Sequence, residues 1–157
     1  MIRRHRSYAR RMDRPMWTCP DCGRQFVTAK VWHSCMPRRG VEEILADRPD
    51  GVIAAYHAFE AMVRDLGPIQ VEPLKSRIGF KARATFAGAT FTKSTMRAGF
   101  VLASVVSDPR LKVDSYGGRH VHTLEVTDPA QLDDPAVRGW LADAYWLGSE
   151  GAGKRIS

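Results

Sequence analysis

The sequence predicts an α+β fold preceded by a small metal-binding segment. Apolar residues recur at helical spacing near both ends of residues 40–148 and alternate in the segments between them, which indicates helices flanking a sheet. Three cysteines and a histidine lie close together near the N-terminus and predict the metal-binding segment. We therefore divide the chain into a basic arm (1–15), a zinc-binding knuckle (16–39), an α+β domain (40–148) and a tail (149–157).

Residues 41–49, VEEILADRP, predict a short helix that stops at the proline. Asp50 is expected to cap a second helix, which ends at Gly67-Pro68. His57 falls on the solvent face of this helix. The apolar stripe of the second helix consists of Val52, Tyr56, Phe59, Val63 and Leu66.

An antiparallel sheet of about five strands is expected after the helix pair, because short segments alternate between apolar and polar residues. The segments are 69–73, 75–83, a hairpin of 85–92 with 96–104, and a hairpin of 110–116 with 119–126. Gly117-Gly118 suits the turn of the last hairpin. Pairing Tyr116 with Arg119 sets Val113 opposite His122 and gives one continuous apolar face.

A last helix is predicted to begin at Asp134-Pro135, with the aspartate as its cap, and to end at Gly148. Its apolar face consists of Val137, Trp140, Leu141, Ala144 and Leu147. The predicted order is therefore helix, helix, antiparallel sheet and helix.

The spacing of the cysteines is C-x2-C, ten residues, then H-x-C. Four soft or borderline ligands so close together are typical of a closed tetrahedral zinc site. Because four protein ligands leave no position open for water, we expect structural Zn2+ without catalysis at the metal. The alternative is three free thiols beside an unrelated histidine. The predicted ligands are Cys19, Cys22, His33 and Cys35.

The stretch WTCPDCGRQF resembles the hairpin of DNA-binding Cys2His2 fingers. Those fingers place two histidines about one helical turn apart on a helix that enters the major groove. His33 and Cys35 are only two residues apart and cannot share one side of a helix. We therefore predict a zinc knuckle without base-specific readout.

The positive charge of the chain is concentrated at its N-terminus. Residues 1–39 hold ten Lys or Arg against two Asp, a net of +8, whereas residues 40–157 hold fourteen against fifteen Asp or Glu, a net of −1. This asymmetry predicts a polyanion such as nucleic acid as partner, and solubility alone is the alternative. The candidate nucleic-acid contacts are Arg3, Arg4, Arg6, Arg10 and Arg11.

A second basic region lies in the predicted sheet, where no acidic residue occurs between Glu72 and Asp108. Four of the six cations in this region are expected to share a strand face, where they would hold a phosphate or carboxylate if the face is partly covered. If the face is open, it would instead be a basic patch that binds nucleic acid. The remaining alternative is an ordinary solvent-exposed sheet face. The candidate anion-binding residues are Lys75, Arg77, Lys81, Arg83 and His122.

The chain is 44 % hydrophobic and 26 % charged, which fits a globular protein. Its apolar runs are too short to cross a bilayer, and no apolar segment follows the charged N-terminus as in a secretory signal. We expect a cytoplasmic protein without a membrane partner.

The runs VEPLKSRIGFKARATFAGATFTKSTMRAGFVLAS, RHVHTLEV and VRGWLADAYWLG resemble an uncharacterised bacterial family, domain-of-unknown-function family number 5655, over residues 41–148. The resemblance implies a helix pair, an antiparallel sheet and a last helix, and it brings no established activity. The position of a zinc-binding segment ahead of the domain, as in this chain, also resembles the arrangement in members of that family.

The sequence contains no P-loop, dinucleotide-binding glycine pattern or Gly-x-Ser-x-Gly elbow, which removes the usual grounds for proposing an enzyme. We therefore predict a non-enzymatic, zinc-containing protein that associates with nucleic acid. One alternative is a domain, enzymatic or not, that binds a small anion or nucleotide through the basic strand face. Another is a protein–protein interaction module.

Overall fold

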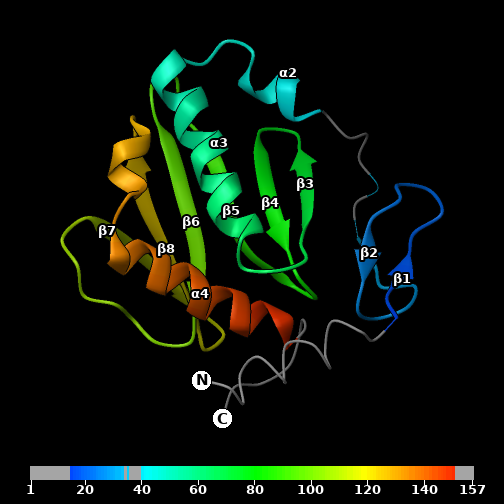
Figure 1. Ribbon diagram of the computed structural model, residues 1–157. Helices are drawn as coiled ribbons and strands as arrows, with labels where there is room; N and C mark the ends of the chain where they lie inside the picture. Colours follow the sequence, from blue (N-terminus) through cyan, green and yellow to red (C-terminus); the bar gives the residue numbers. More distant parts are fainter. Residues whose placement is uncertain (1–14, 34, 36–39, 151–157) are drawn as a thin grey trace.

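The computed structural model describes residues 15–33, 35 and 40–150. It contains a six-stranded antiparallel sheet with two long helices packed on one face (Figure 1). The strands of this sheet are β3 (Gln70–Leu74), β4 (Arg77–Lys81), β5 (Thr85–Phe91), β6 (Met96–Leu102), β7 (Leu111–Tyr116) and β8 (Arg119–Val126). Their order across the sheet is β3-β4-β5-β6-β8-β7. The predicted α+β fold is confirmed, with six strands where about five were expected.

The helices of the domain are α2 (Val41–Leu45), α3 (Asp50–Arg64), the 3-10 helix η1 (Pro129–Leu132) and α4 (Pro135–Ser149). Four of the five predicted stripe residues of α3 are fully buried, and Leu66 lies beyond its end and is partly buried. Asp50 is the first residue of α3 and not its cap, because Pro49 holds the N-cap position without a side-chain hydrogen bond. Among the described helices, none is long and apolar enough to span a membrane.

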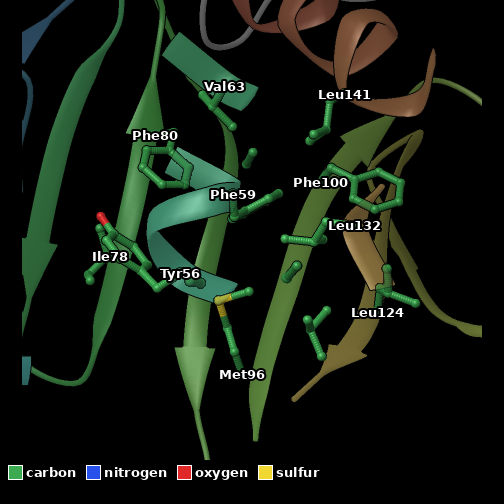
Figure 2. Close-up of a cluster of buried hydrophobic side chains, with 14 of the residues drawn as sticks. Tyr56, Phe59, Val63, Ile78, Phe80, Met96, Phe100, Leu124, Leu132 and Leu141 are labelled. Carbon is green, nitrogen blue, oxygen red and sulfur yellow. The ribbon is translucent and has the colours of Figure 1, made fainter. Parts of the chain in front are cut away.

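The core lies between these helices and one face of the sheet (Figure 2). Phe59 of α3 meets Phe80 of β4 edge to face, with ring centroids 5.5 Å apart. Strand residues alternate strictly on β6, where Met96, Ala98 and Phe100 are buried. Such alternation leaves the intervening residues of β6 on the other face of the sheet.

The register of the last hairpin is as predicted. Tyr116 pairs with Arg119, Val113 with His122, and β7 and β8 are antiparallel. Asp134 caps α4 as predicted, since its side chain accepts a 2.8 Å hydrogen bond from the N–H of Ala136.

Gly148 does not end α4 but lies inside it. A Cβ at this position would lie 2.6 Å from Cβ of Phe86, so the glycine permits close contact between α4 and β5. Its carbonyl accepts hydrogen bonds from the backbone N–H groups of Arg83 and Ala84, at 3.2 and 2.9 Å. A bulge in β5 leaves Phe86 without an opposite residue on β4. The helix end is therefore held directly on the sheet.

Candidate metal centre

The described part of the N-terminal segment is a two-stranded hairpin, β1 (Trp17–Thr18) and β2 (Gln25–Phe26). Between its strands the N–H of Cys19 donates to the carbonyl of Arg24, and the N–H of Gly23 donates to the carbonyl of Cys19, both at 2.8 Å. Gly23 has a φ of +73°, which glycine adopts without steric cost. The turn therefore brings the thiols of Cys19 and Cys22 to one side.

Four ligand atoms gather there, from Cys19, Cys22, His33 and Cys35, and all lie within 4.8 Å of one another. We call these residues the Cys3His cluster. The Cys19 and Cys35 sulfurs are 3.7 Å apart, and Nε2 of His33 is 3.4 Å from the Cys22 sulfur. Metal–sulfur bonds of about 2.3 Å and metal–nitrogen bonds of about 2.0 Å give tetrahedral edges of roughly 3.5–3.8 Å. The cluster therefore has the dimensions of a site that could hold a metal ion.

Hydrogen bonds around the cluster favour this role. Nδ1 of His33 lies 2.8 Å from the carbonyl of Val31, a contact that raises the pKa of His33 and turns Nε2 toward the sulfurs. A backbone hydrogen bond from Arg24 lowers the pKa of Cys22 to about 6. Burial raises the pKa of Cys35 to about 11, and a bound cation would favour its thiolate.

The hairpin and the Cys3His cluster, residues 16–33 and 35, are the described part of the knuckle, which contacts the sheet at β4 and β3. Lys81 of β4 is only 5 % exposed, and burial lowers the pKa of its amine. Nζ of Lys81 donates to the carbonyl of Gln25 and lies 4.1 Å from the centre of the Phe26 ring. Gln70 of β3 adds a side-chain hydrogen bond to Gln25. The knuckle is thus docked on β3 and β4.

The structure does not bring the five candidate anion-binding residues together. Only Arg77 and Lys81 belong to β4, so the expectation of four cations on one strand face is wrong. Lys75 lies in the turn after β3, with a φ of +41°. The bulge in β5 follows β4 closely, and Arg83 is buried beside the end of α4. Lys81 is engaged by the knuckle.

His122 lies on the helix-covered face of the sheet, opposite to Arg77. Its ring is fully buried and stacks on Phe100 with centroids 5.6 Å apart. His122 is therefore a core residue, and both of its ring nitrogens have hydrogen-bond partners, the N–H of Val106 and the carbonyl of His120. The candidate contacts Arg3 to Arg11 of the basic arm lie outside the described residues.

Sequence reasoning missed the uncovered face of the sheet. Glycines occur in the interiors of β4, β5 and β6, and the register sets Gly79 opposite Gly88 and Gly88 opposite Gly99. Glycine weakens a strand interior, so three such residues were a signal in the sequence. Only the register shows that they form one row.

A family model described as "Domain of unknown function (DUF5655)" matches residues 41–148. The chain belongs to the DUF5655 family. The DUF5655 domain begins at the first residue of α2 and ends within the last turn of α4, so it includes the whole six-stranded sheet and excludes the knuckle. No curated protein and no solved structure matches the chain.

Proposed function

We propose that this chain is a zinc-containing, non-enzymatic protein that binds single-stranded nucleic acid through the knuckle and the basic segment ahead of the DUF5655 domain. The observation that carries the proposal is the exposure of Trp32, which is 90 %. This residue directly precedes His33 of the Cys3His cluster, so the metal site would hold it in place.

The donor set favours zinc. Three thiols and one imidazole are soft or borderline ligands, and a tetrahedral arrangement of them is typical of Zn2+. Four protein ligands complete the coordination, so the ion would stabilise the knuckle without activating water. Structural zinc supplies about 10–16 kcal/mol of apparent binding free energy, enough to fold a segment this small.

An exposed indole beside positive charge is suited to stacking on unpaired bases. Tryptophan is usually well buried, and one that faces solvent on a small rigid element presents its π-face to a partner. Val31 and Lys30 next to it are exposed as well. The net charge of +8 in residues 1–39 supplies attraction to phosphates. Single strands fit better than duplexes because their bases are free to stack.

The test is fluorescence anisotropy with labelled twelve-nucleotide oligo(U) and oligo(dT), measured from low to physiological salt. Trp32→Ala should weaken binding about tenfold, the lower part of the ~1–3 kcal/mol measured for one stacked base, and leave the salt slope unchanged. Val105→Ala is the matched control, because this apolar side chain is 56 % exposed on the DUF5655 domain and lies outside the knuckle. It should bind as the native chain does.

Deleting residues 1–14 removes six arginines and should reduce the salt slope instead. Zinc content is measured on every variant, so that an intact Cys3His cluster is established independently. No binding by the native chain at low salt contradicts the proposal. Equal affinity of the native chain and Trp32→Ala contradicts the role of the indole.

A further inference from the structure

The face of the sheet away from α3 and α4 carries a groove of about 390 Å³. Its floor is the glycine row, Gly79, Gly88 and Gly99, which are neighbours on three adjacent strands. Because these residues have no side chains, the backbone of three strands is open to a ligand. Within the described residues, no helix packs on this face.

Two of the three glycines are not required by the backbone. Neither Gly79 nor Gly99 has a positive φ, and an added Cβ would find its nearest neighbour at 3.7 or 3.8 Å, an ordinary contact. At Gly88 the same atom would lie 2.9 Å from the carbonyl oxygen of Ile78. Glycine costs about 0.5–1 kcal/mol in a strand interior relative to alanine. Close approach of a ligand to the floor explains glycine at the two roomy positions.

A row of polar residues runs directly beside the glycine row. Arg77 of β4 pairs with Thr90 of β5, which pairs with Arg97 of β6. The two arginines are two strand spacings, about 10 Å, apart at the backbone, so their long side chains can reach one anion above Thr90. Arg77 has no ion pair with any described residue. Arginine suits carboxylate and phosphate because its planar fork donates two parallel hydrogen bonds.

Arg97 is not firmly engaged elsewhere. Its Nε lies 3.5 Å from Glu125, and both side chains are at least half exposed, so this ion pair is weak and easily exchanged. Beyond Arg97 the face continues into a hollow of mixed charge that includes Lys112, Asp114 and Glu125. Asp114 and Glu125 interrupt the cations there, and Arg110 is paired with Asp108 and Asp134, so this face has no continuous positive track for a phosphate backbone and suits one small anion better.

Apolar side chains and one unsatisfied acceptor complete the groove, the apolar ones on β6, β8 and β7 and the acceptor on the edge strand β3. Val101, Val121 and Tyr116 line the groove. Glu72 lines it next to Gly79 and is only 6 % exposed, and its Oε2 has no hydrogen-bond partner among the described residues. A buried carboxylate oxygen without a donor is costly, and a donor group on a ligand would relieve it.

We propose that this groove binds a small organic anion. A flat apolar or aromatic body lies on the glycine row, and a carboxylate or phosphate contacts Arg77, Thr90 and Arg97. A hydrogen-bond donor on the ligand meets Glu72. The volume matches that of sites for small molecules, which begin at about 300 Å³. The site uses no residue of the knuckle and does not depend on nucleic-acid binding.

The test is an NMR titration of the ¹⁵N-labelled full chain with phenyl phosphate, inorganic phosphate and phenol. Phenyl phosphate should shift the amide signals of the glycine row in a saturable manner. Inorganic phosphate lacks the ring that lies on the glycine row, and phenol lacks the charge that the arginines bind, so each should bind at least about tenfold more weakly. The substitutions Arg77→Gln and Arg97→Gln should each weaken the binding of phenyl phosphate by a similar factor. Arg138→Gln, on exposed α4 surface beside Asp133, is the matched control and should not.

Gly99→Ala tests the floor of the groove directly. The added methyl fits the fold but occupies the surface on which the ring lies. It should therefore weaken the binding of phenyl phosphate at least tenfold and leave the amide signals outside the groove unchanged. Gly139→Ala, on α4 with no atom within 4 Å of the new Cβ, is the control. The proposal is overturned if no probe shifts the glycine-row amides. It is also overturned if Gly99→Ala and Arg97→Gln bind phenyl phosphate as the native chain does.

Discussion

The backbone N–H of Val106 donates a 2.9 Å hydrogen bond to Nε2 of His122. On the other side of the ring, Nδ1 lies 3.0 Å from the carbonyl of His120, so Nδ1 carries the proton and Nε2 is the acceptor. Burial lowers the pKa of His122 and outweighs the opposite effect of the hydrogen bond to the carbonyl of His120. The folded protein thus holds this imidazole in its neutral form.

Stability should therefore fall as the pH decreases through the usual histidine range. The unfolded chain takes up a proton on His122 at a pH of about 6.5, whereas the folded chain does so only at lower pH. The free energy of unfolding should decline from about pH 6.5 down to about pH 5.5, before most carboxyl groups titrate. Urea denaturation at several pH values measures this decline.

His122→Phe should flatten the pH dependence while keeping the stack on Phe100. It should also cost about 1–3 kcal/mol at neutral pH, because the N–H of Val106 loses its acceptor. His57→Gln is the control, since His57 is exposed on α3. An unchanged pH dependence in His122→Phe would contradict the assignment.

Metal analysis should find about one zinc per chain, and Cys22→Ser should lose it. The DUF5655 domain should stay folded in this variant, because its hydrophobic core contains no residue of the knuckle. NMR spectra should then show the narrow chemical-shift range of unfolded chain for the knuckle and well-dispersed chemical shifts for the folded sheet. Unfolding of the whole chain on chelation would show that the domain depends on the metal.

Gly148→Ala should destabilise the domain by about 1–3 kcal/mol, the usual cost of overpacking. The new methyl would lie 2.6 Å from Cβ of Phe86 and 3.1 Å from the carbonyl oxygen of Ala84. Gly139→Ala in the same helix has free space and should stabilise by up to about 1 kcal/mol, the helix propensity difference. Thermal denaturation of the two variants compares them directly, and equal effects would contradict the close contact of α4 with β5.

Lys81→Met should release the knuckle from the sheet without unfolding either part. Methionine retains apolar contact with the Phe26 ring but cannot donate to the carbonyl of Gln25. Backbone ¹⁵N relaxation should then show faster, independent motion of the knuckle. Lys112→Met, on the exposed surface of β7, is the control. Unchanged relaxation would mean that other contacts hold the knuckle.

The elements of the fold could be predicted because their signals are local. The stripe of α3 repeats every three or four residues, and the turn Gly117-Gly118 determines the register of the hairpin around it. The Cys3His cluster could also be predicted, since its ligands lie within seventeen residues and one turn aims two of them.

The arrangement of the basic residues could not be predicted, because it depends on how strands pair. The bulge at Phe86 and the end of β4 separate Arg83 from Arg77, and no local pattern marks that bulge. His122 faces the helices as its predicted register requires, which places it on the opposite side of the sheet from Arg77. The groove likewise appears only when three strands are aligned.

Lys81 and Gly79 are two residues apart on one strand, so β4 contacts the knuckle at one point and forms the floor of the groove at another. Residues two apart on a strand share one face. This arrangement makes β4 a common element of two otherwise separate sites. By thermodynamic reciprocity, any factor by which metal binding changes the affinity of the groove equals the factor by which a groove ligand changes the affinity for metal. Zinc retention reports on occupancy of the groove if that factor differs from one.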